Sequence, residues 1–168
     1  GGDWFHLGTG VGSAEGSGQG HNGEMDKTHI GYLRTDLLNF TYTAVDQIYD
    51  PGATAAQVST ALNAGRSVVN YCGHGSTQAW TTTGFSNTNV TALTNDNMLP
   101  FIFSVACVKG QFSGYTCFAE AWLRSTHNGN PVGAIATYMS SINQSWIPPM
   151  DAQDEFTDLL CAQTMTTF

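Results

Sequence analysis

The chain is short of positive charge and contains no long apolar run. Only 5 of its 168 residues are Lys or Arg, against 13 Asp or Glu, which gives a formal net charge of −8. Nucleic acids and anionic membranes attract the opposite charge balance, so we expect neither as a partner. No apolar stretch approaches the roughly 18 residues of a membrane span, and no signal peptide is recognisable. The sequence therefore predicts a mature or excised segment with no membrane span.

Cysteine is also sparse, with four residues in the chain: Cys72, Cys107, Cys117 and Cys161. An even number permits two disulfides, but a domain of this length has enough core to fold without them. The spacing does not match a small disulfide scaffold, so free thiols are favoured. A hydrophobic content of 41% predicts a globular fold, and 19 glycines with few charges are typical of an extracellular bacterial protein.

Strand and helix signals alternate along the whole chain. Asp26 and Thr54 each suit a helix N-cap, and residues 8–23 form an unusually long Gly-rich loop. We expect strands at 4–7, 42–49, 67–72, 101–106 and 132–138, and helices at 27–39, 55–64, 117–126 and 152–163. Continuously apolar strands that alternate with helices predict one α/β domain over residues 1–168, with a parallel sheet and helices on both faces. We also expect the last edge strand to be missing from this chain.

Two of the expected strands end next to side chains that can do chemistry. His74 follows the strand at 67–72, and Cys107 follows the strand at 101–106. Sites in parallel α/β sheets form at the carboxyl ends of strands, so the imidazole and the thiol should share one edge. A neighbouring imidazole turns a thiol into a strong nucleophile. The backbone amides of Gly75 and Cys107 are suited to form an oxyanion hole.

Simpler interpretations of the same residues stay open. A cysteine that ends an apolar strand is often buried and inert, and a histidine there often only bonds its own loop. Cys72, His74 and Cys107 also provide ligand types that bind zinc, as in a zinc hydrolase, although no CxxC pair supports this.

Three segments together resemble a known family. They read VNYCGHGS at 69–76, LPFIFSVACV at 99–108 and SINQSW at 141–146. The first two are similar to the catalytic-His and catalytic-Cys segments of the gingipains, and the third to the loop that lines their S1 pocket. Gingipains are secreted bacterial cysteine endopeptidases with a caspase-like fold. The similarity runs from about residue 4 to residue 160, and it is closer to the arginine-specific members than to the lysine-specific one.

The resemblance implies a role for each matching residue. Cys107 matches the nucleophile, His74 the general base, and Glu15 the acid that orients the histidine. Asp26 matches the S1 carboxylate that receives a substrate arginine, a chemically sound pairing because a carboxylate accepts two parallel bonds from a guanidinium. Trp146 would cover the arginine stem, Val105 would line the pocket wall, and Gln144 belongs to the pocket loop.

The resemblance also implies properties of the whole protein. It implies a caspase-like three-layer sandwich, a secreted or cell-surface location, peptide substrates with arginine at P1, and structural Ca²⁺ without an assigned ligand set. The chain would then be a fragment of a larger secreted protein. Cys72 departs from the family, which usually has Thr there, and a second thiol near the site could form an inhibitory disulfide. Lysine specificity, or an inactive homologue that serves as a binding or adhesion module, remains an alternative.

Overall fold

The computed structural model describes residues 2–163. At its centre is one five-stranded sheet with the order β2-β1-β3-β6-β9, in which all neighbours are parallel. The strands are β1 Leu7–Gly12, β2 Ala44–Tyr49, β3 Val68–Cys72, β6 Phe101–Val105 and β9 Ala136–Met139. Gly12 pairs with Cys72, and Cys72 with Val105, so three strands end level with one another. This register brings the segments after β3 and β6 to one edge of the sheet.

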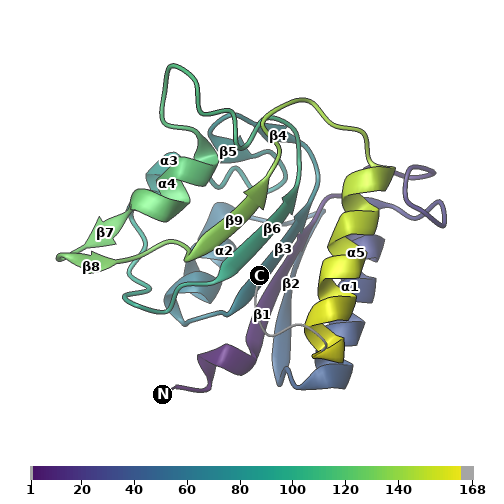
Figure 1. Cartoon of the computed structure of the whole chain (residues 1–168), viewed down its shortest axis with the longest axis horizontal. Coiled ribbons are helices and arrows are strands. Elements are labelled where there is room, and N and C mark those ends of the chain that lie inside the picture. The colour runs from purple at the N-terminus through teal and green to yellow at the C-terminus, as the bar shows by residue number, and fades with distance from the viewer. Residues whose placement is uncertain (1, 164–168) are drawn as a thin grey trace.

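Helices cover both faces of this sheet (Figure 1). One face carries α1 Asp26–Phe40 and α5 Ile147–Ala162, and the other carries α2 Ala55–Asn63, α3 Asn87–Thr91 and α4 Phe118–Arg124. The small elements are η1 Asp3–His6, the hairpin β4 Gly75–Ser76 with β5 Ala79–Trp80, and the hairpin β7 Thr126–His127 with β8 Asn130–Pro131. The predicted α/β sandwich with a parallel sheet is confirmed.

Each face of the sheet has its own hydrophobic core. Under α2, α3 and α4 the aromatic rings of Trp80, Phe85, Phe118 and Trp122 pack together, with Trp80 and Trp122 centroids 5.7 Å apart. Under α1 and α5 the cluster is aliphatic and aromatic, and includes Ile30, Leu33, Phe103 and Met150. Both cores are therefore continuous with the strands that lead to the site.

The amino-terminal strand begins later than the sequence indicates. Residues 3–6 are a 3₁₀ helix rather than a strand, and β1 occupies the first part of the expected loop. The reason is close packing of α1: a Cβ at Gly10 would lie 2.5 Å from Ile30 Cγ2, and one at Gly12 would lie 2.5 Å from Lys27 Cα. Glycine there marks the approach of a helix, not a turn.

Several other boundaries differ from the prediction. α5 begins at Ile147 instead of 152, because proline is tolerated in the first turn of a helix, where Pro148 and Pro149 lie. Asp26 is the first residue of α1, and the N-cap is Met25, so the capping prediction for Asp26 is wrong. The prediction for Thr54 is confirmed, since its hydroxyl accepts from the amide of Gln57 in a capping box. α3 and the two short hairpins were not expected.

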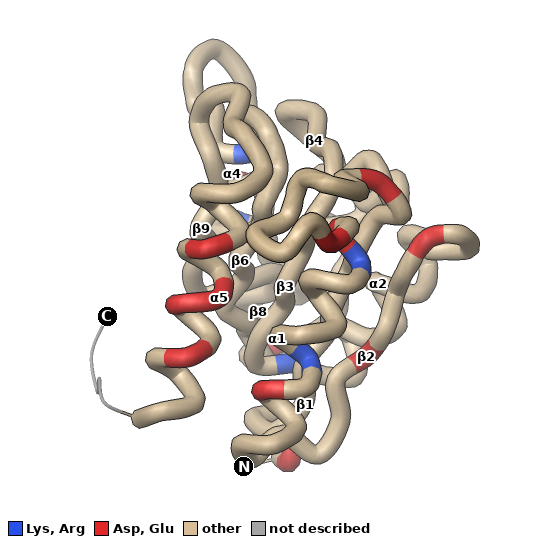
Figure 2. Tube along the Cα trace, turned by 90° about the vertical axis from the view of Figure 1, so that its right-hand side faces the viewer, with Lys and Arg blue, Asp and Glu red and all other residues tan. Residues whose placement is uncertain are grey.

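The surface charge is concentrated on a few elements (Figure 2). α5 carries Asp151, Asp154, Glu155 and Asp158 and has no Lys or Arg, which makes it the most acidic helix of the fold. Within residues 2–163 no helix is both long enough and apolar enough to cross a membrane.

Candidate active site

A small cavity of about 60 Å³ lies at the carboxyl edge of β3 and β6. Five of the residues singled out from the sequence line it: His74, Val105, Cys107, Gln144 and Trp146. The parallel register explains this meeting, because His74 and Cys107 follow neighbouring strands and Val105 ends one of them. The other two residues come from the segment that leads into α5.

Three further candidate residues, Glu15, Asp26 and Gly75, do not belong to the cavity lining and lie around it. Glu15 and Asp26 each contact a lining residue, and Gly75 follows the lining residue His74 in the chain.

Glu15 is joined to the candidate base. Its carboxylate oxygen Oε2 lies 2.5 Å from Nε2 of His74, and both side chains are at least half exposed. A carboxylate only accepts, so the hydrogen of the imidazole sits on Nε2 and Nδ1 is left as the basic nitrogen. The indole of Trp146 meets the imidazole edge-on, with centroids 5.3 Å apart. The histidine ring is thus held from two sides.

The Cys107 thiol is half-buried and faces the backbone of the loop before α5. Its Sγ lies 3.7 Å from the carbonyl oxygen of Gln144 and accepts from the Gln144 amide at 3.5 Å. The same loop is held again one residue later in the Cys107 segment, where the Val108 amide donates to the carbonyl of Ile142 at 3.0 Å. These bonds fix the distance between the thiol and the pocket loop.

Asp26 is fully buried at the start of α1, behind Trp146. Its Oδ2 accepts from the Ser13 hydroxyl at 2.5 Å and its Oδ1 accepts from the Trp146 indole at 2.7 Å. Cys72 hydrogen-bonds to the same carboxylate, and burial together with this negative charge raises the pKa of the Cys72 thiol well above its usual value. Cys72 is therefore part of the Asp26 environment.

Gly16 packs against both Asp26 and Trp146. Its φ is +72°, and a Cβ there would lie 2.3 Å from Oδ1 of Asp26 and 2.8 Å from Nε1 of Trp146. Only glycine satisfies both the left-handed backbone and the close approach.

All four cysteines are free thiols, so the structure contains no bond between Cys72 and Cys107. Cys72 is fully buried, whereas Cys107 lines the cavity. Among the described residues, no group of three or more His, Cys, Asp or Glu side chains is arranged to hold a metal ion. The residues suggested for zinc thus do not converge, and the calcium predicted from the resemblance receives no ligand set.

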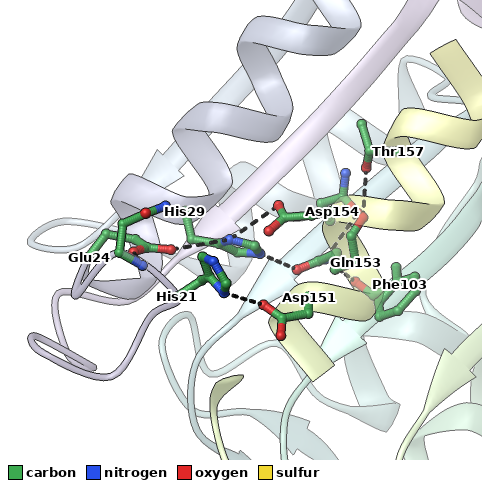
Figure 3. A network of polar contacts seen from close by, with 10 residues as sticks. His21, Glu24, His29, Phe103, Asp151, Gln153, Asp154 and Thr157 are labelled. Atoms are coloured by element: carbon green, nitrogen blue, oxygen red, sulfur yellow. Dashed lines mark hydrogen bonds and ion pairs between the residues drawn. The ribbon is translucent and has the colours of Figure 1, made fainter. Parts of the chain in front are cut away.

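A buried polar network supports the site from below (Figure 3). The side-chain amide of Gln153 on α5 donates to Asn70 Oδ1 at 3.0 Å and to the Phe103 carbonyl at 3.2 Å. Since both amide hydrogens are used, its Oε1 accepts from Nε2 of His29 on α1, at 3.0 Å. The network therefore joins both helices of this face to β3 and β6, the strands that carry the candidate base and nucleophile.

The other ring nitrogen of His29 faces acids. Nδ1 lies 3.5 Å from Asp154 and 4.0 Å from Glu24. Burial raises the pKa of Asp154, and the nearby His29 partly opposes that rise.

Lys109 is a residue near the site that the sequence analysis missed. It is fully buried, and its Nζ donates to the carbonyl of Ser76 at 2.8 Å. Burial lowers the pKa of Lys109 to about 7. A sequence signal existed, because the lysine follows a buried strand by only a few residues in a chain with two lysines.

Comparison with known proteins agrees with this geometry. The sequence pattern of Peptidase family C25 matches residues 8–167, nearly the whole chain. This chain belongs to peptidase family C25. Within that family, it is 46% identical to Gingipain R2 of Porphyromonas gingivalis over 159 residues, which is 94% of this chain and 22% of the relative. It is 30% identical to Lys-gingipain HG66 of the same species over 126 residues, or 74% of this chain and 7% of the relative.

The fold comparison gives the same result. A crystal structure of the Arg-specific cysteine proteinase gingipain R matches with a TM-score of 0.93 at 44% identity, covering 96% of this chain and 38% of the other. The predicted gingipain resemblance and caspase-like α/β fold are confirmed. The C25 chain described here spans only about a fifth of the length of the curated Gingipain R2 it matches.

Proposed function

We propose that this C25 domain is a cysteine endopeptidase that cleaves peptide bonds after arginine. The observation that carries the proposal is the cavity at the carboxyl edge of the sheet, which is lined by both His74 and Cys107 while Glu15 holds the imidazole from behind. Membership of a peptidase family and the similarity to Gingipain R2 support the same reaction.

The route of the proton in this reaction follows from the hydrogen bonding of the His74 imidazole. Glu15 keeps hydrogen on Nε2 of His74, so Nδ1 takes the proton of the Cys107 thiol. The thiolate attacks the substrate carbonyl carbon, and the amides of Gly75 and Cys107 stabilise the oxyanion. His74 returns the proton to the leaving amine as the peptide bond breaks, and a water molecule then hydrolyses the acyl-enzyme.

The proposed selector for arginine is Asp26. Its partners described above, which are Ser13, Trp146 and Cys72, are all uncharged. A buried carboxylate is costly without a cation, and a substrate guanidinium provides one together with two parallel hydrogen bonds. The guanidinium would bond the Asp26 oxygen that now accepts from the Trp146 indole, and the indole would then lie against the arginine stem.

The test is turnover of matched fluorogenic peptides with arginine or lysine at P1, under reducing conditions. We expect cleavage after arginine, loss of nearly all turnover in Cys107→Ala, and full turnover in Cys161→Ala, which removes another partly exposed thiol. Preference for the lysine peptide would overturn the assignment of arginine. A folded protein that cleaves neither peptide and resists iodoacetamide at Cys107 would be a binding module instead.

Secretion or a cell-surface location, protein substrates and structural Ca²⁺ are proposals that rest on the resemblance to the gingipains. For calcium, a melting temperature that stays the same with and without a chelator would contradict the proposal.

A further inference from the structure

Lys109 lies under the loop that the proposed mechanism uses to bind the oxyanion. A Cβ at Gly75 would lie 2.3 Å from Cε and 2.7 Å from Nζ of Lys109, so the lysine stem packs directly against the glycine backbone. Its Nζ bonds the carbonyl of Ser76, the next residue, at 2.8 Å. The ammonium also sits 4.9 Å from the centroid of the Phe118 ring on α4.

The backbone after Cys107 is bent in a way that sends Lys109 inward. Val108 has a φ of +54°, a left-handed conformation that is strained for a β-branched residue. Neighbouring bonds hold this bend, with the Gly110 amide donating to the Ser140 carbonyl at 2.8 Å and the Ala119 amide donating to the Lys109 carbonyl at 3.1 Å. Strain of this kind persists where the surroundings enforce it, and it commonly accompanies function.

Few charged groups surround the lysine. The β4–β5 hairpin that covers it, residues 75–80, has no charged side chain. On α4, Glu120 pairs with Arg124 at 3.8 Å. The remaining titratable groups on the packed segments are thiols and the imidazole beside the hairpin: Cys107, Cys117 and His74. Of these, the negative form of Cys107 raises the pKa of Lys109 and so opposes part of the effect of burial.

We propose that Lys109 is a positioning residue for the peptidase reaction, which holds the Gly75–Ser76 backbone in place for the oxyanion. The proposal rests on the proposed function for the oxyanion, but the ordering of this backbone can be measured without any substrate. A lysine buried without a paired acid is costly, so its presence under the Gly75–Ser76 backbone calls for a reason outside folding.

The experiment compares Lys109→Met, Lys109→Gln and Lys109→Arg in the full chain. The first removes both charge and donor, the second keeps a donor, and the third keeps the charge. Lys27→Met is the matched control, because the Lys27 ammonium also donates to a backbone carbonyl, that of Asp50, at 2.9 Å. Circular dichroism verifies that each variant is folded.

The first readout is amide hydrogen exchange in the β4–β5 hairpin, residues 75–80, which needs no substrate. We expect Lys109→Met to speed exchange there about tenfold, because the Ser76 carbonyl loses its donor, and Lys109→Gln to recover part of the protection. Lys109→Arg should restore the protection, and Lys27→Met should leave it unchanged. A folded Lys109→Met protein with wild-type exchange in this hairpin would overturn the proposal, even if the wild type cleaves no peptide.

The second readout is turnover of the P1-arginine peptide. We expect Lys109→Met to lower kcat about tenfold with little change in KM, since a displaced oxyanion donor weakens the transition state more than substrate binding. Lys109→Gln should recover part of this loss. An equal kcat in wild type and Lys109→Met would refute the positioning of the loop. Absent turnover in the wild type would refute the proposed function and leave the hydrogen exchange of the hairpin to decide.

Discussion

Replacing Lys109 by methionine should stabilise the fold at acidic and neutral pH. Burial lowers the pKa of this lysine to about 7 from the usual 10.5. The unfolded chain therefore binds more protons between pH 7 and pH 10.5, so wild-type stability rises across that window and the full cost of the buried charge is present below it. A shift of this size corresponds to about 5 kcal/mol. Methionine fills a similar volume but leaves the Ser76 carbonyl without its donor, which costs about 1–3 kcal/mol.

The expected net gain of Lys109→Met is thus about 2–4 kcal/mol at pH 6. Between pH 7 and pH 9 the gain in free energy of unfolding should shrink by about 3 kcal/mol. The reason is that the folded wild-type protein holds a neutral lysine there, and removing the proton from the unfolded chain costs less free energy as the pH rises. Urea unfolding followed by tryptophan fluorescence at four pH values measures this difference. Both proteins carry Cys107→Ala, so that the thiol does not titrate. A difference in free energy of unfolding that is constant from pH 6 to pH 9 would refute the reasoning.

Three other predictions follow from contacts described above. Gly16→Ala should raise KM for a P1-arginine peptide about tenfold and destabilise the fold by about 1–3 kcal/mol, because the new Cβ would collide with Asp26 in a left-handed backbone; kinetics like those of the wild type would contradict this. Gln153→Leu should cost about 3 kcal/mol in thermal unfolding, since it leaves Asn70 and other buried groups unpaired; a melting temperature within a degree of the wild type would show that the network is dispensable. Iodoacetamide at pH 7 should label Cys107 first, because burial raises the pKa of the other three thiols; peptide mass mapping that finds another cysteine labelled as quickly would reject this order.

The parts of the fold that the sequence predicted are those with strong local signals. β3 and β6 are continuous apolar runs, and α2 carries its own capping box at Thr54. β1 was displaced because its sequence, LGTGVG, has little intrinsic strand preference. Gly10 and Gly12 are explained by the approach of α1, through Ile30 and Lys27, and a local pattern within the strand does not show this contact.

The candidate site shows the same division. The order of strands and the ends of β3 and β6 placed His74 and Cys107 at one edge, and the resemblance supplied Val105, Gln144 and Trp146. The roles of all site residues remain predictions. Lys109 escaped notice because a lysine is normally exposed, and its burial results from the bend at Val108 and the packing of the β4–β5 hairpin.

The link between His29 and Gln153 has a consequence for the order of events during synthesis. The two residues are 124 positions apart, and Asp26 and Trp146 are 120 apart, yet each pair is in direct contact. The pocket wall therefore needs α5, which leaves the ribosome after the candidate nucleophile and base have already been made. Until then, Asp26 lacks the indole that covers it and β6 lacks the amide that bonds Phe103. A nascent chain thus carries its thiol and imidazole before the cavity between them has its second wall, so a finished cleft exists only after this late helix docks.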